Sequence, residues 1–188
     1  LMDAASIGAE IWTCGFGGVW RGGDSGRVQC FYTSGDAPCV AASRHLLEGV
    51  LILDGYELKA LETSAHGVTV HNLGARVSDT PVALYEDARG DVWVSTLIAG
   101  IRRFRWRDSS AARLQLRLDA NYRPRLGLPH DATGAKLRPV GTRLFAFADS
   151  GILELNASGS AFEAVSELRQ FRGVAAVAAL PRGADRRT

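Results

Sequence analysis

The sequence predicts an all-β fold, a β-propeller arc of about four blades. Three observations support it: a phrase that recurs along the chain, glycines at a regular spacing, and turn-forming residues between short strands. The fullest copy of the phrase is DVWVSTLIAGIRRF, and its positions are 91–104. The other copies are EIWTCGFGGVWR (10–21), RLFAFADSGILEL (143–155) and the most diverged one, HLLEGVLILDGYEL (45–58). The glycine after each turn falls at position 18, 55, 100 or 151, and the gaps of 37, 45 and 51 residues fit a blade period of about 40–50 residues.

Each copy reads as a strand, a chain reversal at the glycine and a second strand. A large side chain before the reversal supplies apolar area for the centre of a small sheet, and the candidates are Trp12, Leu46, Trp93 and Phe145. A sheet of this size is only marginally stable alone, so each one needs a neighbouring sheet stacked on its face. Repetition of the phrase is therefore what a propeller requires.

The rest of one blade can be outlined around the fullest copy. PVALYED (81–87) predicts the strand that leads into a turn at 88–91, and Gly100 begins a third strand. RLQLRL (113–118) alternates leucine with polar residues and predicts the outer strand of the blade. We interpret SAFEAVSELRQFRG (160–173) as a loop and the first strand of another blade, with a short helix as the alternative because Glu, Ala and Leu favour helices.

Length, composition and charge indicate how many domains to expect and which classes of partner are unsupported. The 188 residues show no linker or shift in composition, so we expect a single domain over residues 1–188. A net charge of +2 gives no reason to expect binding to nucleic acid or to a membrane surface. The longest apolar runs, such as Val174 to Leu180, fall short of the roughly 20 residues that cross a bilayer. Because the chain starts at Leu1, we expect it to be part of a longer polypeptide.

The three cysteines, Cys14, Cys30 and Cys39, have neither CxxC spacing nor nearby histidine pairs, and we predict no zinc site. Cys30 and Cys39 bracket a loop and could form a disulfide in an oxidising compartment. The alternative is that all three are small buried side chains.

The stretch YEDARGDVWVSTLIAGIRRF (85–104) resembles the two-component regulator propeller repeat, in which an acidic turn with glycine precedes an aromatic-led strand. The positions that match the repeat are Asp87, Gly90, Trp93, Thr96, Gly100, Ile101 and Phe104. Ser95 departs from it because it stands where glycine is usual, and Phe145 replaces the tryptophan in a later copy.

The resemblance implies an extracytoplasmic or periplasmic input domain of a transmembrane sensor, with a histidine kinase or diguanylate cyclase elsewhere in the full-length protein. The implied partners are a small molecule, oligosaccharide or protein ligand and the linked output domain. Membrane contact would come only through other segments. It also implies more blades than the four copies visible here, so this segment would be part of a larger propeller. We therefore expect no cofactor and no catalytic residues in this segment, which we interpret as not being an enzyme.

Individual candidates for chemistry have structural explanations. The four histidines, His45, His66, His71 and His130, read as surface or loop residues, and strand alternation places His66 and His71 on opposite faces, so no metal site is expected. Carboxylates beside turn glycines commonly cap turns, which is the role expected of Glu86, Asp87 and Asp149. Ser109, Ser110 and Ser158 lack a GxSxG context. The glycine-rich stretches 15–18 and 21–26 lack the helix and lysine of a phosphate loop, and they read as turns.

RRFRWRD (102–108) interleaves arginines with Phe104 and Trp106, a composition that also suits base stacking and phosphate neutralisation. Because positions 104 and 106 share one face of a strand, we interpret the segment as a blade strand with its aromatics packed inward and its arginines solvated.

The sequence therefore predicts a ligand-sensing domain that acts by binding. Two alternatives stay open: a carbohydrate-active enzyme on the same fold, lyase or glycosidase, and a scaffold for protein–protein interaction.

Overall fold

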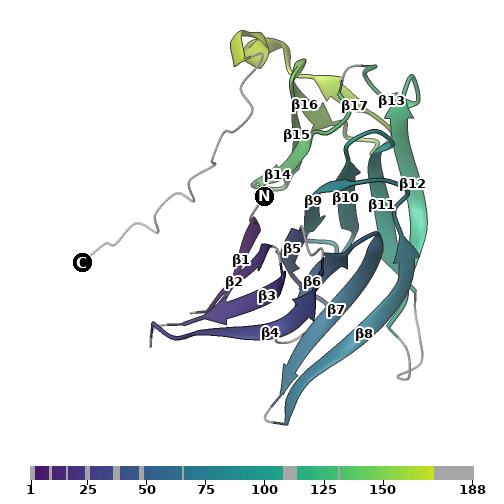
Figure 1. Cartoon of the computed structure of the whole chain (residues 1–188). Coiled ribbons are helices and arrows are strands. Elements are labelled where there is room, and N and C mark those ends of the chain that lie inside the picture. Colours follow the sequence, from purple (N-terminus) through teal and green to yellow (C-terminus); the bar gives the residue numbers. More distant parts are fainter. Residues whose placement is uncertain are drawn as a thin grey trace.

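The computed structural model describes residues 3–171 except 9, 16, 24–25, 36–38, 47–48, 65, 108–113 and 131. Its strands form four sheets, each built from consecutive strands, and the sheets are arranged as the blades of a β-propeller (Figure 1). The predicted all-β fold and its four blades are confirmed.

The first blade contains β1 (Asp3–Ile7), β2 (Glu10–Gly15), β3 (Gly17–Gly22) and β4 (Val28–Ser34). The second contains β5 (Cys39–Ala42), β6 (Gly49–Asp54), β7 (Glu57–Ser64) and β8 (Gly67–Arg76). The third contains β9 (Pro81–Glu86), β10 (Val92–Thr96), β11 (Gly100–Trp106), β12 (Leu116–Pro124) and the short parallel strand β13 (Gly127–Leu128). The fourth contains β14 (Lys136–Val140), β15 (Arg143–Ala148), β16 (Gly151–Leu155) and β17 (Phe162–Ala164), followed by a 3₁₀ helix, η1 (Ser166–Phe171).

The first strands of successive blades lie beside one another: β1 contacts β5, β5 contacts β9, and β9 contacts β14. The later strands fan outward from these inner strands (Figure 1). Alternate side chains of a strand point to opposite faces, so each inner blade offers one apolar face to the blade before it and another to the blade after it.

Three apolar cores fill the three joints between blades. Trp12, Val50 and Ile52 belong to the core between the first and second blades. The core between the second and third blades is built from leucines, alanines and valines together with Phe104. Trp93 belongs to the core between the third and fourth blades. Stability therefore depends on the stacking of sheets, because no described blade has a core of its own.

Glycines lie at the start of the third strands of the first and third blades, just after the chain reversal, where the sequence predicts them. Gly18 and Gly100 have φ angles of 147° and 91°, in the region that favours glycine. A Cβ atom on Gly18 would lie 1.9 Å from the carbonyl oxygen of Tyr32, and one on Gly100 would lie 2.2 Å from that of Tyr122. At both places the outer strand approaches too closely for any side chain, which explains the repeated glycine.

A β-bulge interrupts the pairing of the third and fourth strands in the first three blades. The registers leave Phe31 as an extra residue on β4, Leu73 and Gly74 on β8, and Asp119 on β12. Phe31 packs on the ring of Trp12, and Leu73 is fully buried between the second and third blades. Because of the bulge, one side chain of the outer strand points into the interface with the next blade.

Two predictions about the strands of the second and third blades are corrected. Leu51, not Leu46, occupies the centre of the second blade, because Leu46 lies in the loop before β6. The outer strand predicted at 113–118 runs from Leu116 to Pro124; Leu116 is buried, whereas Leu118 is exposed on the outermost strand.

The interpretation of 160–173 as a first strand is also wrong. Phe162–Ala164 is the last strand of the fourth blade, and Ser166–Phe171 is a 3₁₀ helix. Asn156 explains the difference, since its Oδ1 accepts hydrogen bonds from the backbone N–H groups of Ser160 and Ala161 and closes the hairpin between β16 and β17.

Candidate functional site

In the segment predicted at 102–108, of which 102–107 are described, the side chains divide between two joints. Phe104 is buried against the second blade and Trp106 is half-buried against the same core, which confirms that the aromatics pack inward. The expectation that the arginines are solvated holds for Arg105 and Arg107, which are exposed, but not for Arg102 and Arg103, which are half-buried. Arg102 donates hydrogen bonds to the carbonyl of Arg76 and the hydroxyl of Ser78, while Arg103 and Arg105 lie on the opposite face among carboxylates.

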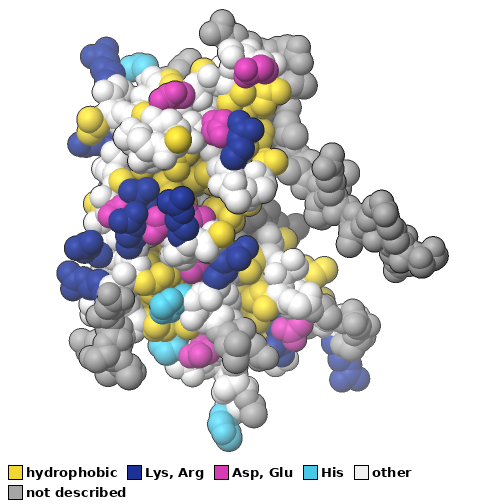
Figure 2. All heavy atoms as spheres, turned by 180° about the vertical axis from the view of Figure 1, so that it is seen from behind, with side chains coloured by type: hydrophobic (Ala, Val, Ile, Leu, Met, Phe, Trp, Pro, Cys, Tyr) yellow, Lys and Arg dark blue, Asp and Glu magenta, His cyan; other side chains and the backbone are white. Residues whose placement is uncertain are grey.

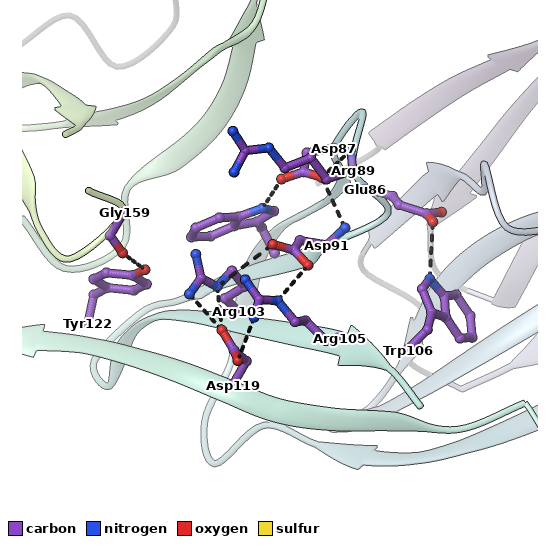
Figure 3. Close-up of polar contacts among 11 residues, drawn as sticks. Glu86, Asp87, Arg89, Asp91, Arg103, Arg105, Trp106, Asp119, Tyr122 and Gly159 are labelled. Atoms are coloured by element: carbon purple, nitrogen blue, oxygen red, sulfur yellow. Dashed lines mark hydrogen bonds and ion pairs between the residues drawn. The ribbon is translucent and has the colours of Figure 1, made fainter. Parts of the chain in front are cut away.

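Arg103, Arg105, Asp91 and Asp119 form one network on the face of the third blade that points towards the fourth (Figure 3). Arg103 Nη2 lies 2.6 Å from Asp119 Oδ2 and its Nε lies 3.9 Å from Asp91 Oδ2. Arg105 Nε lies 3.0 Å from Asp91 Oδ1 and its Nη1 lies 3.2 Å from Asp119 Oδ1. Each arginine therefore bridges the same two carboxylates, Asp91 just before β10 and Asp119 at the bulge in β12.

Burial distinguishes the four members of the network. The side chains of Asp91, Asp119 and Arg103 are 10%, 15% and 17% exposed, whereas that of Arg105 is 47% exposed. The hydrogen bond and the negative charge of Asp91, with a further contribution from Asp119, raise the pKa of Arg105. The network thus presents one permanently charged guanidinium to solvent, held in place by two carboxylates that retain acceptor capacity.

Two aromatic side chains, Trp93 and Tyr122, lie on the buried side of the network. The guanidinium carbon of Arg103 lies 5.3 Å from the ring centroid of Trp93, whose indole N–H donates to Asp87 Oδ2 at 2.9 Å. Trp93 stacks on Tyr122, and the Tyr122 hydroxyl donates to the carbonyl of Gly159 in the fourth blade at 2.6 Å. Burial raises the pKa of Tyr122, so this hydroxyl remains a donor at neutral pH.

The two carboxylates predicted to cap the turn have different roles. Asp87 Oδ1 accepts the backbone N–H groups of Arg89 and Asp91, which confirms its capping role. Glu86 is only 2% exposed, and it accepts hydrogen bonds from the backbone of Arg44 in the second blade and from the indole of Trp106. Its carboxylate therefore ties two blades together.

A second polar cluster joins the first and second blades, and no sequence signal singled it out. Asp54 accepts hydrogen bonds from Tyr32, Ser34 and Lys59, and Lys59 also donates to the Tyr32 hydroxyl at 3.0 Å. Burial raises the pKa of Asp54, but the three hydrogen bonds outweigh it and lower the pKa overall. The hydrogen bond to Asp54, followed by that to Tyr32, raises the pKa of Lys59. All four groups satisfy one another, which suits a joint between blades.

The histidines lie apart. His45, His66 and His130 are exposed, and His45 stacks on Trp106 with its ring centroid 4.3 Å away. His71 is half-buried, with Nε2 3.0 Å from Glu62 Oε2. No three potential metal ligands gather anywhere in the described ranges.

The other sequence candidates show no catalytic grouping. Ser158 is exposed in a turn with Asn156 and Ser160, and Asp149 is exposed beside Gly151. Ser109 and Ser110 lie outside the described residues. The glycine-rich stretches form turns where described, between β2 and β3 and between β3 and β4. All three cysteines are described and none is in a disulfide, so the bond considered between Cys30 and Cys39 is not formed.

Basic and acidic side chains are intermixed on the face shown in Figure 2, where dark blue groups flank magenta ones near its middle. No helix in the described part of the chain is long and apolar enough to cross a membrane.

No protein-family model matches the sequence, and no curated protein sequence matches it either. The fold is similar to that of a gluconolactonase-like protein (13% identity, TM-score 0.57), with 85% of this chain aligned to 61% of that one. It is similar to the extracellular domain of a hybrid two-component system of B. thetaiotaomicron (9% identity, TM-score 0.53; 86% of this chain, 21% of that one). Virginiamycin B lyase from Staphylococcus aureus shares the fold as well (10% identity, TM-score 0.55; 84% of this chain, 52% of that one).

This chain spans less than two thirds of each of these three structures. Two of the three carry the names of enzymes, and this corrects the expectation that the segment is not an enzyme, because the fold is shared with catalytic proteins. The extracellular domain among them agrees with the coarser part of the resemblance drawn from residues 85–104, namely the propeller fold. By fold, the chain is a four-bladed arc of a β-propeller.

Proposed function

We propose that this chain is a ligand-recognition arc of an extracytoplasmic sensor propeller, and that the network around Arg105 is its recognition surface. The observation that carries the proposal is the identity of the bulge residue on each outer strand. The first two blades place apolar Phe31 and Leu73 in the joint, while the third places Asp119 there. A charge at a position where packing calls for an apolar side chain is typical of a functional site.

The chemistry of the surface suits a ligand with many hydroxyl groups or a carboxylate, such as an acidic oligosaccharide. Arg105 is the exposed donor, and Asp91 and Asp119 can accept hydrogen bonds from hydroxyl groups beside it. Because the two carboxylates already orient the guanidinium, little side-chain entropy is lost when the ligand binds. Resemblance of residues 85–104 to a sensor repeat and fold likeness to an extracellular sensor domain support the choice of a sensor.

Signalling would require that the ligand bind two states of the propeller with different affinity. The network contacts the joint of the third and fourth blades through Trp93 and Tyr122. A ligand that shifts Arg103 or Arg105 would therefore alter the packing of this joint. We place the output domain and any membrane segment in other parts of the full-length protein, with this arc on the extracytoplasmic side.

Isothermal titration calorimetry with glucuronate, galacturonate and neutral gluco-oligosaccharides tests the proposal. We expect Arg105→Ala to weaken binding about tenfold or more, as for the loss of a charge-assisted hydrogen bond. Arg143→Ala is the matched control, because Arg143 is another exposed arginine paired with a carboxylate, Glu154. Equal affinities of the two variants, or no binding of any probe, would contradict the assignment.

The second candidate is an enzyme that opens a lactone or cleaves a polysaccharide. It is favoured by the fold likeness to a gluconolactonase-like protein and to a lyase. Turnover of gluconolactone or of a uronic-acid polymer, abolished by Asp119→Asn at unchanged thermal stability, would establish it in place of the sensor.

A further inference from the structure

Arg117 lies directly opposite Arg105 on the neighbouring strands β12 and β11. Paired residues of antiparallel strands point to the same face, with their Cβ atoms about 4.5–5.5 Å apart. The next pair, Trp106 and Leu116, packs into the core between the second and third blades. Because successive side chains alternate between faces, Arg105 and Arg117 both point to the other side, which is the side of the network. Both side chains are exposed.

Two positive charges directly opposite each other destabilise a sheet. The other blades with a bulge have no such pair at this place, the second residue pair beyond the bulge. The first blade places Gln29 opposite Arg21, and the second blade places His71 opposite Ala60. The third blade places two guanidinium groups opposite each other. An arrangement that costs stability without a structural gain is typical of a functional position.

The carboxylates of the network do not compensate this second charge. Asp91 and Asp119 are both paired with Arg103 and with Arg105 (Figure 3). The side chain of Arg117 forms no hydrogen bond or ion pair with any residue that the structure describes. Its charge is therefore available to a ligand, next to a guanidinium that is already held in place.

The place of Arg117 in the arc keeps it accessible. Its strand is the fourth of the third blade, and the side chain is exposed although both adjoining blades, the second and the fourth, are described. A blade added at either end of the arc would lie beside the first or the fourth blade, so it would not cover Arg117.

We propose that Arg117 determines specificity in ligand recognition, and that an acid group of the ligand lies between Arg105 and Arg117. This rests on the function proposed above and narrows the ligand to a saccharide that carries a carboxylate, such as a uronic acid. A carboxylate has two oxygens, so it can accept hydrogen bonds from both guanidinium groups and remove their mutual repulsion. Asp91 and Asp119 remain the acceptors for hydroxyl groups of the same ligand. A neutral saccharide would use Arg105 and the carboxylates but gain nothing from Arg117.

Isothermal titration calorimetry with glucuronate and with neutral gluco-oligosaccharides is the test. Arg117→Ala should weaken glucuronate binding about tenfold and change the affinity for the neutral probes by less than about twofold. Arg117→Lys, which keeps the charge without the planar fork, should give an intermediate affinity for glucuronate. Added salt should weaken glucuronate binding more in the wild type than in Arg117→Ala.

Arg125→Ala is the matched control. It removes the same charge from another exposed arginine, just beyond the end of β12 that pairs with the start of β11 and hence away from the pair of Arg105 and Arg117. Both affinities should stay at their wild-type values in this control. A loss of glucuronate binding equal to that in Arg117→Ala would reduce the effect to net charge and overturn the proposal.

Thermal unfolding without ligand separates recognition from a structural role. Arg117→Ala removes the like-charge pair, so its melting temperature should be unchanged or higher. A lower melting temperature, or equal weakening of glucuronate and neutral probes, overturns the specificity role of Arg117. If Arg105→Ala weakens glucuronate binding and Arg117→Ala does not, only the role of Arg117 fails and the function of the network stands. If the wild type binds no probe, both fail.

Discussion

Trp93 and Arg103 face each other across β10 and β11, and the arginine covers the indole ring at 5.3 Å. Trp12 and Arg21 repeat the arrangement in the first blade at 5.6 Å. In the fourth blade Phe145 faces Glu154, and the cation over the ring is instead Arg143, 4.9 Å from its centroid. A positive charge therefore covers the central aromatic ring in three blades, although the residues that supply it differ.

Trp93→Ala should lower the free energy of unfolding by about 3–5 kcal/mol, because it opens a cavity in the joint of the third and fourth blades and removes the platform for Arg103. Trp93→Phe should cost much less, since Phe145 holds the equivalent position of the fourth blade. Urea unfolding followed by far-ultraviolet circular dichroism measures both. Equal losses in the two variants would show that the aromatic ring is not what this position requires.

Asp119→Phe should separate stability from recognition. The substitution gives the third blade the residue that the first blade has at its bulge, where Phe31 packs beneath Arg21 at 4.1 Å. Replacing a partly buried charge by a well-packed apolar group is often neutral or stabilising. We expect an unchanged or higher melting temperature together with loss of saccharide binding, measured by thermal unfolding and calorimetry. Asp149→Phe, at an exposed turn, is the control.

Gly100→Ala should destabilise the protein by more than the roughly 1–2 kcal/mol of a left-handed alanine, because its Cβ would also meet the Tyr122 carbonyl. Gly55→Ala isolates the backbone effect, as Gly55 has a φ of 58° and open space around its Cβ position. Chemical denaturation of the two variants gives the difference. If Gly55→Ala costs as much as Gly100→Ala, close approach of the outer strand is not the reason for the glycine.

Asp54 should make stability depend on pH in the acid range. Its pKa is lowered in the folded protein, so its contribution is present above the ordinary pKa of 3.8 and is lost as the pH falls through the folded value. The pKa of Lys59 is raised, so its contribution is present up to its ordinary pKa of 10.5 and is lost as the pH rises beyond it.

Asp54→Asn should therefore lower the free energy of unfolding by about 1–3 kcal/mol at pH 7. The free energy of unfolding of this variant should also fall less steeply than that of the wild type below pH 3.8. Denaturant titrations between pH 2.5 and 7 measure it, with Asp149→Asn as the exposed control. If the free energy of unfolding of Asp54→Asn falls below pH 3.8 as steeply as that of the wild type, Asp54 does not contribute to the loss of stability in acid.

The elements that the sequence predicts correctly are those set by short-range chemistry. Gly100, Trp93 and the strand at 81–87 follow from turn geometry and from two-residue alternation, and both can be read within a few residues. The capping role of Asp87 is local for the same reason.

Features that depend on register between strands were not predicted. Asp119 belongs to no motif, and it reaches Arg103 and Arg105 only because β12 carries one residue more than β11 at that point. The cluster of Asp54 with Tyr32 joins residues from different blades, and no local pattern relates them. Asp119 continues the polar positions that alternate with the leucines at 114, 116 and 118, so the local pattern contains no signal of the bulge.

The bulges also affect how the repeats can be compared and exchanged. The first and third blades carry one additional residue there and the second carries two, so the copies align only when a gap is placed inside the outer hairpin. An alignment without that gap exchanges the inward and outward sides of every outer strand beyond it. Grafting β12 into another blade would thus have to include Asp119, or the transplanted strand would present its wrong side to the neighbouring sheet.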